Sequence, residues 1–284
     1  MRRFDYFKPR SITEALRLKE TMPDALFVAG GTDLLVKIKD NEIQPSALIS
    51  LRSIQGLSGA EVNKVTRIGA LTTISDLIQN PALCENYPLL VDAAKYLGSI
   101  QIRNVATIGG NLCNCSPAAD TALPLLVLNA KVRLQSIQDS REMALSDFFK
   151  GPGESCLNSD EILTDILLEL SRPSAKTKFL KIGRVKMDLA IASIALLLEM
   201  DGERCQNVRI AAGSVAPVPL RLSEVEELLE GKPVTKELVA EAQKVASEIV
   251  VPITDIRASK EYRRHIVGVL VKRAFEDVLG WSQA

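Results

Sequence analysis

The sequence predicts an α+β protein made of two domains, and three observations support this. The chain has 284 residues, the length of two domains of ordinary size. Short apolar strands alternate with capped helices through roughly the first 170 residues, whereas a hairpin and then helices fill the remainder. Residues 171–174 (Ser-Arg-Pro-Ser) separate the two patterns. We therefore expect domains at 1–171 and 172–284.

The N-terminal region predicts a helix, a strand and a glycine turn in that order. Residues 11–14 (Ser-Ile-Thr-Glu) form a capping box that opens a helix through about Lys19. Residues 25–29 form a short apolar strand that ends at Gly30-Gly31, and Thr32 or Asp33 can cap the helical turn that follows. Further strands are predicted at 47–51 and 65–70, and a helix from Ser75. A change of composition near Ser58 divides this domain into lobes at 1–57 and 58–171.

A second glycine turn follows a predicted helix in the second lobe. Pro88 suits the first turn of a helix to about Leu97, and Gly98 suits its end. Residues 107–111 (Thr-Ile-Gly-Gly-Asn) then lead to Asp120, which can cap an apolar helix over 121–129. Strands are predicted at 131–135 and 161–170.

The C-terminal region predicts a hairpin and three helices. Segments 191–200 and 208–212 flank Asp201-Gly202, a hairpin signal. Residues 223–226 read as a capping box, Thr235 as the cap of a helix to about 249, and Ser259 as the cap of a helix to about 279.

Composition excludes several classes of function. Apolar residues make up 46% and charged residues 25%, as in soluble globular proteins. The 35 basic and 35 acidic residues balance, whereas a groove for nucleic acid normally leaves a basic excess. Five cysteines without a CxxC pair indicate neither a disulfide framework nor a zinc knuckle, and no export signal or bilayer-length apolar run is visible. We expect a cytoplasmic protein that binds no nucleic acid and has no membrane span.

The sequence offers no catalytic or metal-binding constellation. His265 is the one histidine, and it is expected at an ordinary surface or interface position on the last helix. The motifs HExxH, GxSxG and GxxxxGK[ST] are absent, so hydrolase and P-loop chemistry are disfavoured. We predict no catalytic residue and no metal ligand.

The two glycine turns are the unusual feature. Paired glycines let backbone N–H groups converge on an anion, and a helix start favours negative charge. Either turn alone is more simply a tight chain reversal, but two similar turns suit a diphosphate, and hence a dinucleotide. Neither turn has the GxGxxG pattern, which disfavours a Rossmann nicotinamide site.

Several segments together resemble one family. AGGTDLL at 29–35, TIGGNLCNCSPAAD at 107–120, IGALTTISDL at 68–77, IGRVKMDLAIAS at 182–193, RIAAGSVAPVPLR at 209–221 and ITDIRASKEYRRHIV at 253–267 occur in family order. They resemble the FAD-binding medium subunit of molybdenum hydroxylases, the group of xanthine dehydrogenase and aerobic carbon monoxide dehydrogenase. The resemblance implies a two-lobed FAD-binding domain of the PCMH, or vanillyl-alcohol-oxidase-like, type and a smaller α+β domain behind it.

The resemblance also implies which residues hold a non-covalent FAD between the two lobes. For the diphosphate and its flanks it implies Phe27, Val28, Ala29, Gly30, Gly31, Thr32, Asp33, Leu34, Thr107, Ile108, Gly109, Gly110 and Asn111. For the ribityl or ribose portion it implies Asn114 and Asp120, the second also being a candidate helix cap. For the adenine side it implies Leu97, Gly98, Ile102 and Ala106, and for the flavin ring Ile162 and Leu163. These apolar residues would be core residues in any fold.

Two further features carry alternatives. Lys181 resembles a family lysine near the flavin, where a cation favours the reduced ring, but the residues alone favour the alternative of a solvated lysine at a strand end. One branch of the family, resembling 4-hydroxybenzoyl-CoA reductase, carries a [4Fe–4S] cluster on a cysteine-bearing insertion that is not visible here. Cys113 and Cys115 are therefore expected to be small buried residues or to line the flavin pocket.

The resemblance implies an electron-transfer subunit. FAD would accept electrons from a [2Fe–2S] partner and pass them to an external, soluble acceptor. A large molybdopterin subunit and a small [2Fe–2S] subunit are the implied partners, commonly as a dimer of heterotrimers. The alternatives are a stand-alone FAD oxidoreductase of the same fold and a nucleotide-binding interaction protein without redox work. The substrate and the acceptor, among NAD, quinone, ferredoxin and dioxygen, stay open.

Overall fold

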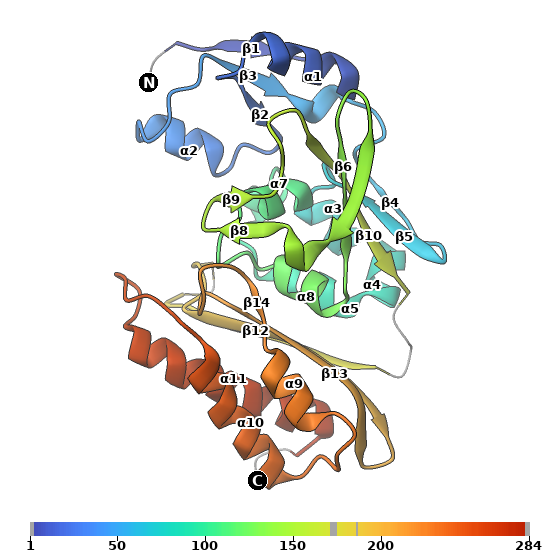
Figure 1. Ribbon diagram of the computed structural model, residues 1–284, viewed down its shortest axis with the longest axis vertical. Coiled ribbons are helices and arrows are strands. Elements are labelled where there is room, and N and C mark those ends of the chain that lie inside the picture. Colours follow the sequence, from blue (N-terminus) through green and yellow to red (C-terminus); the bar gives the residue numbers. More distant parts are fainter. Residues whose placement is uncertain (1–2, 171–174, 186, 282–284) are drawn as a thin grey trace.

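The computed structural model describes residues 3–170, 175–185 and 187–281. Three sheets follow one another along the long axis of the molecule, from the N-terminal end to the C-terminal end (Figure 1). The predicted boundary at 171–174 lies outside the described residues. The α+β class, with an FAD-binding-type first domain and a smaller second one, is confirmed.

The first sheet is parallel and lies at the N-terminal end. Its order is β1-β3-β2. The elements of this part of the chain are β1 (Asp5–Phe7), α1 (Ile12–Thr21), β2 (Leu26–Val28), α2 (Leu34–Lys39), β3 (Ala47–Ser50) and the 3-10 turn η1 (Leu51–Ser53). Ser11 Oγ accepts from the Glu14 N–H as the capping box predicts, but the Glu14 carboxylate accepts from the Arg10 N–H. Asp33 stands at the cap of α2 without a side-chain cap bond.

The second sheet is antiparallel and its central strand is buried on both faces. Its order is β4-β5-β10-β6-β7. The strands are β4 (Ala60–Glu61), β5 (Val65–Gly69), β6 (Lys131–Gln135), β7 (Ser140–Ala144) and β10 (Ile162–Glu169), with the 3-10 turn η2 (Leu145–Asp147) and the small hairpin of β8 (Phe149–Gly151) and β9 (Glu154–Ser155). Ile162 to Leu168 of β10 are all buried because β10 pairs with β5 and β6. The strand predicted at 161–170 is confirmed.

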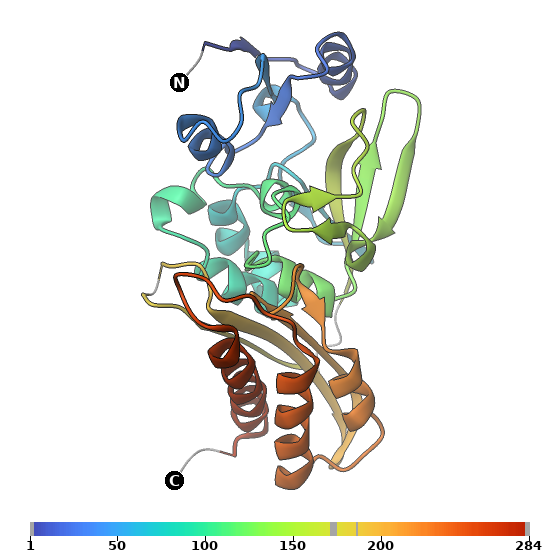
Figure 2. The ribbon, with the colours of Figure 1, turned by 60° about the vertical axis from the view of Figure 1, so that its left-hand side comes forward.

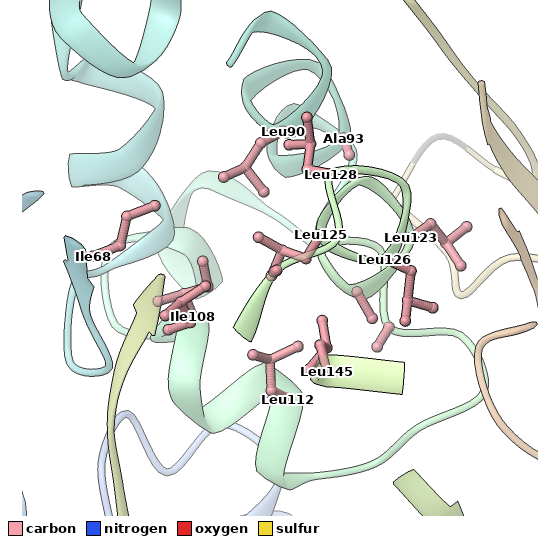
Figure 3. Packing of buried hydrophobic residues seen from close by; sticks show 14 of the residues in the cluster. Ile68, Leu90, Ala93, Ile108, Leu112, Leu123, Leu125, Leu126, Leu128 and Leu145 are labelled. Carbon is pink, nitrogen blue, oxygen red and sulfur yellow. The ribbon is translucent and has the colours of Figure 1, made fainter. Parts of the chain in front are cut away.

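Helices between these strands build the main core. They are α3 (Ile74–Gln79), α4 (Pro81–Asn86), α5 (Pro88–Lys95), α6 (Ile100–Arg103), α7 (Ile108–Cys113) and α8 (Ala122–Val127). Leu125 of α8 packs with Leu90 of α5 and with Ile108 and Leu112 of α7 (Figure 3). This packing fixes the start of α8, and with it Asp120.

The third sheet and its helices form the C-terminal part. Its order is β11-β12-β13-β14, all antiparallel. The elements are β11 (Lys176–Ile182), β12 (Ala192–Asp201), β13 (Arg204–Gly213), β14 (Leu220–Arg221), α9 (Ser223–Leu229), α10 (Lys236–Ile249) and α11 (Lys260–Leu279). The helices cover one face of this sheet, and the other face is turned toward α5 and α8 (Figure 2). The hairpin predicted at Asp201-Gly202 is confirmed.

The predicted caps of the last three helices have different outcomes. Thr235 accepts from the Leu238 N–H and Ser259 from the Tyr262 N–H, so both caps are confirmed. The capping box at 223–226 is wrong, because Ser223 is already helical and the Glu226 carboxylate binds Arg221 instead.

Candidate functional site

The two glycine turns lie against each other. A Cβ on Gly30 would clash with the Val105 carbonyl oxygen and would lie 2.9 Å from the Val105 carbonyl carbon. A Cβ on Gly110 would lie 3.9 Å from the Ala29 Cβ. The strand end at 28–30 and the segment 105–110, far apart in sequence, therefore meet backbone to backbone.

One cavity of about 660 Å³ opens between these turns and the C-terminal part of the chain. Of the residues predicted for FAD, it is lined by Phe27, Ala29, Gly30, Gly31, Thr32, Asp33, Leu34, Leu97, Gly98, Ile102, Ala106, Thr107, Gly109, Gly110, Asn111, Asn114, Asp120, Ile162, Leu163 and Lys181. Residues from all three sheet regions thus line the same cavity.

Val28 and Ile108, which the resemblance also implies for FAD, do not line this cavity. Val28 lies between Phe27 and Ala29 on a strand, where neighbouring side chains point to opposite faces, and it packs against Ile38 and Leu48. Ile108 is completely buried in the main core.

The first turn supplies free backbone donors. In the described part of the chain, no acceptor meets the N–H groups of Gly31, Thr32, Asp33 and Leu34. Gly31 has φ +75°, which permits this bend without strain. These N–H groups stand just before and at the start of α2, where an anion is favoured.

The second turn does not supply free donors, contrary to the expectation that both turns do. It is the first turn of α7: the Thr107 hydroxyl accepts from the Gly110 N–H at 3.1 Å, and the Gly109 N–H donates to the Ala70 carbonyl at 2.8 Å. The Asn111 N–H donates to the Thr107 carbonyl. The second turn instead provides a surface without side chains that a ligand can approach closely.

Polar side chains complete the wall near the two turns. Asn111 Oδ1 accepts from the Thr121 hydroxyl at 2.6 Å, which leaves the Asn111 amide as a donor. Lys37, on α2, lies 3.4 Å from Asn114 Oδ1. Free N–H groups, an amide and one lysine fit a diphosphate, which a neutral chain can hold through its backbone.

Asp120 and Lys181, which both line the cavity, form a buried ion pair. Lys181 Nζ lies 2.7 Å from Asp120 Oδ2 and 3.1 Å from the Tyr96 carbonyl, and the two side chains are only 3% and 5% exposed. Asp120 Oδ1 has no hydrogen-bond partner among the described residues. Burial raises the pKa of Asp120 to about 6, although the charge and hydrogen bond of Lys181 oppose the rise. The structure therefore does not place Lys181 in solvent, and Asp120 is not a helix cap, since the α8 cap is Thr121.

Comparison with known proteins decides the family. Residues 2–168 match the family described as the FAD binding domain in molybdopterin dehydrogenase, and residues 177–278 match the CO dehydrogenase flavoprotein C-terminal domain. The chain belongs to the FAD-binding subunits of the molybdenum hydroxylases. It is an oxidoreductase subunit of that family, and its cofactor is FAD.

Individual relatives match over almost the whole chain. The glyceraldehyde dehydrogenase medium chain of Sulfolobus acidocaldarius is 35% identical over 97% of this chain and 98% of its own length. The nicotinate dehydrogenase FAD-subunit of Eubacterium barkeri is 32% identical over 98% and 97%. A solved structure of carbon monoxide dehydrogenase from Hydrogenophaga pseudoflava matches with a TM-score of 0.96 and 32% identity over 99% of both chains.

Sequence reasoning missed several residues that line this cavity. They are Leu26, Lys37, Ile43, Leu51, Ala70, Leu71, Ser116, Ala118, Ala119, Gly153, Leu157, Glu161, Met187, Asp188 and Leu189, whereas Cys113, expected as a buried or pocket-lining residue, does line it. Lys37 could have been found, because it stands four residues after Asp33 on one face of the predicted helix. Met187 and Leu189 come from a loop of the C-terminal part, and no local pattern announces them.

The histidine and the cysteines differ in their exposure. His265 is exposed on α11 and does not line the cavity. Burial, with the nearby Cys115 and Cys156, raises the pKa of Cys113 to about 12, and burial raises that of Cys115 to about 11. Among the described residues, no group of three or more His, Cys, Asp or Glu side chains is placed to hold a metal ion. Within the same residues, no helix has the length and apolar character needed to cross a bilayer.

Proposed function

We propose that this chain carries electrons from a [2Fe–2S] partner, through FAD, to an external acceptor. One observation supports this most: a single cavity joins the free N–H groups of residues 31–34 to the buried Asp120–Lys181 pair. Such a site can bind, orient and electrically tune a cofactor, and it needs no acid–base pair of its own.

We propose that different residues lining the cavity bind different parts of the FAD. The N–H groups of residues 31–34 hold the diphosphate, and Gly109 and Gly110 let it approach. Leu97, Gly98, Ile102 and Ala106 lie along the adenine side, and Ile162 and Leu163 lie against the ring. Asn114 and Asp120 take the ribityl or ribose portion.

Bound FAD supplies a centre that can exchange electrons singly or in pairs. The chain's own residues do the rest. Backbone donors fix the diphosphate without a strong basic patch, consistent with the balanced charge of the chain. Lys181, held by Asp120 and by the Tyr96 carbonyl, keeps a positive charge at one end of the cavity.

Assembly with other subunits is part of the proposal. The names "medium chain" and "FAD-subunit" of its relatives support a multi-subunit complex. The partners that we propose are a large molybdopterin subunit and a small [2Fe–2S] subunit, in a dimer of heterotrimers. We place this complex in the cytoplasm, and the domain limits at 57/58 and 171/172 belong to the same proposal. Substrate hydroxylation then takes place on the molybdopterin chain.

Reduction by the partner tests this function. The FAD-loaded chain is mixed with its dithionite-reduced, desalted [2Fe–2S] subunit under argon, and flavin absorbance is followed by stopped flow. We expect bleaching of the flavin and its return on addition of an acceptor such as a quinone. A chain that stays yellow supports the nucleotide-binding alternative. Oxidation of a substrate by the FAD-loaded chain without any partner supports the stand-alone oxidoreductase.

A further inference from the structure

The Asp120–Lys181 pair joins two distant parts of the chain at the cavity. Asp120 ends the loop before α8, whereas Lys181 stands near the end of β11. Two of the three Lys181 N–H donors are used, by Asp120 Oδ2 and the Tyr96 carbonyl. Asp120 keeps one carboxylate oxygen, Oδ1, without a partner among the described residues. An unpartnered buried oxygen of this kind is costly unless a proton or a ligand satisfies it.

Apart from this pair, the charged residues that line the cavity are either exposed or bound to a polar partner. The other titratable residues that line the cavity are Asp33, Lys37, Cys113, Glu161 and Asp188. Arg141 binds both oxygens of Glu161, and Arg184 binds Asp188. Asp33 is exposed, and Lys37 contacts Asn114. Among the described residues that line this cavity, Asp120 is therefore the buried carboxylate with one oxygen that accepts no hydrogen bond.

A second cavity, of about 540 Å³, also reaches Lys181. It is lined by Tyr96, Leu180, Lys181, Ile182, Leu270, Arg273, Glu276, Asp277, Gly280 and Trp281. Of the described residues, Lys181 is the one that lines both cavities. Lys181 therefore borders both cavities.

We propose that Asp120 takes up one proton from solvent when the FAD that it faces gains two electrons, and returns it when those electrons leave. This inference rests on the proposed function. With Asp120 ionised, the pair is neutral; with Asp120 protonated, the pair carries the +1 of Lys181, which offsets one of the two negative charges that the electrons deliver. One O–H bond forms at Asp120, its proton comes from water through the second cavity, and the iron–sulfur partner supplies the electrons.

The ionisation of Asp120 has the right midpoint for such a role. Its pKa of about 6 in the structure means that the carboxyl is mostly ionised at pH 7. Additional negative charge in the cavity raises this pKa further, because a like charge disfavours the carboxylate. At a pH between the pKa of Asp120 beside oxidised FAD and its higher pKa beside reduced FAD, reduction of the FAD is accompanied by the uptake of one proton at Asp120.

The redox potential of the bound FAD tests the proposal. The full chain with FAD is titrated chemically against dyes between pH 4.5 and 9, as wild type, as Asp120→Asn and as the control Asp160→Asn, at an exposed carboxylate that does not line the cavity. One proton taken up with two electrons adds a slope of about 30 mV per pH unit. Just above pH 6, we expect the wild-type potential to fall more steeply than that of Asp120→Asn by this amount. The two slopes should become equal near pH 4.5, and Asp160→Asn should follow the wild type.

Equal slopes for wild type and Asp120→Asn above pH 6 would overturn the proposal. A second measurement needs no variant at position 120: the infrared difference spectrum of the wild-type chain at pH 7.5, reduced minus oxidised. We expect a carbonyl band of a newly protonated carboxyl group that shifts in D₂O, and its absence overturns the proposal even where Asp120→Asn loses FAD. Because a chemical reductant replaces the partner, both readouts are separate from the stopped-flow test of the proposed function.

Discussion

The backbone of Gly30 packs directly on the carbonyl of Val105, with no room for a Cβ between them. This contact brings the strand end of the first lobe against the segment that leads into α7. The free N–H groups of residues 31–34 and the glycines of α7 consequently face one cavity. The proposed FAD site depends on this approach of two backbones more than on any single side chain.

Substitution of Gly30 by alanine should open this contact. The added Cβ meets backbone atoms of Val105 that cannot rotate away, so the two turns must separate. We expect FAD content after gel filtration to fall at least tenfold. The control is Gly151→Ala, where the nearest atom to a Cβ is 3.6 Å away on the Glu154 side chain. FAD contents equal to wild type in both variants would argue against the site.

Removal of Lys181 should change the potential of the FAD while leaving it bound. Lys181→Ala takes away a cation that favours added electrons, so the midpoint potential should fall by about 30 to 60 mV at pH 7, or about 1.4 to 2.8 kcal/mol for two electrons. Dye equilibration measures this shift, and FAD content checks retention. An unchanged potential would show that Lys181 acts only as a structural partner of Asp120.

Asp255 should stabilise the C-terminal part of the chain in a pH-dependent way. Burial alone would raise the pKa of Asp255, but N–H donors of Arg257 and Ala258 and the guanidinium of Arg263 hold it at about 2. Because the folded pKa lies below the ordinary 3.8, the stabilisation is present above pH 4 and is lost as the pH falls toward 2. It amounts to about 2.5 kcal/mol.

Urea unfolding of wild type and Asp255→Asn at several pH values measures this contribution. Arg263 is 2% exposed and also donates to the Ile191 and Ser214 carbonyls, so loss of its carboxylate partner leaves a buried charge. We expect the variant to lose about 3 kcal/mol at pH 7 and less near pH 2.5. A difference between the two proteins that does not change with pH would contradict the assignment.

Thiol reactivity should separate the cysteines. Cys84 is exposed, whereas the raised pKa values of Cys113 and Cys115 keep both as thiols. We expect iodoacetamide at pH 8 to label Cys84 at least tenfold faster than either, as read by peptide mass spectrometry. Rapid labelling of Cys113 would reveal a reactive thiol beside the FAD site.

Much of this fold is readable from local signals. The strand–glycine–helix order around residues 25–38, the hairpin at Asp201-Gly202 and the caps at Thr235 and Ser259 each depend on neighbours in sequence. The resemblance found in the sequence gave the family and the cofactor, and both are confirmed.

Other features depend on contacts that no local pattern encodes. The carboxylate of Glu226 accepts hydrogen bonds from the Arg221 guanidinium and the Ile210 N–H. The predicted capping box at 223–226 therefore does not cap α9. The N–H groups of Gly109 and Gly110 donate to the Ala70 carbonyl and the Thr107 hydroxyl, because this turn begins a helix. The Asp120–Lys181 pair spans 61 residues of sequence, and only the packing of β11 against the first domain brings it together.

A crystal structure of this chain with FAD tests the central claim most directly. We expect the diphosphate oxygens within hydrogen-bond distance of the N–H groups of residues 31–34, with Gly109 and Gly110 against the same phosphates. A diphosphate bound away from residues 31–34, with their N–H groups still facing solvent, would contradict the account.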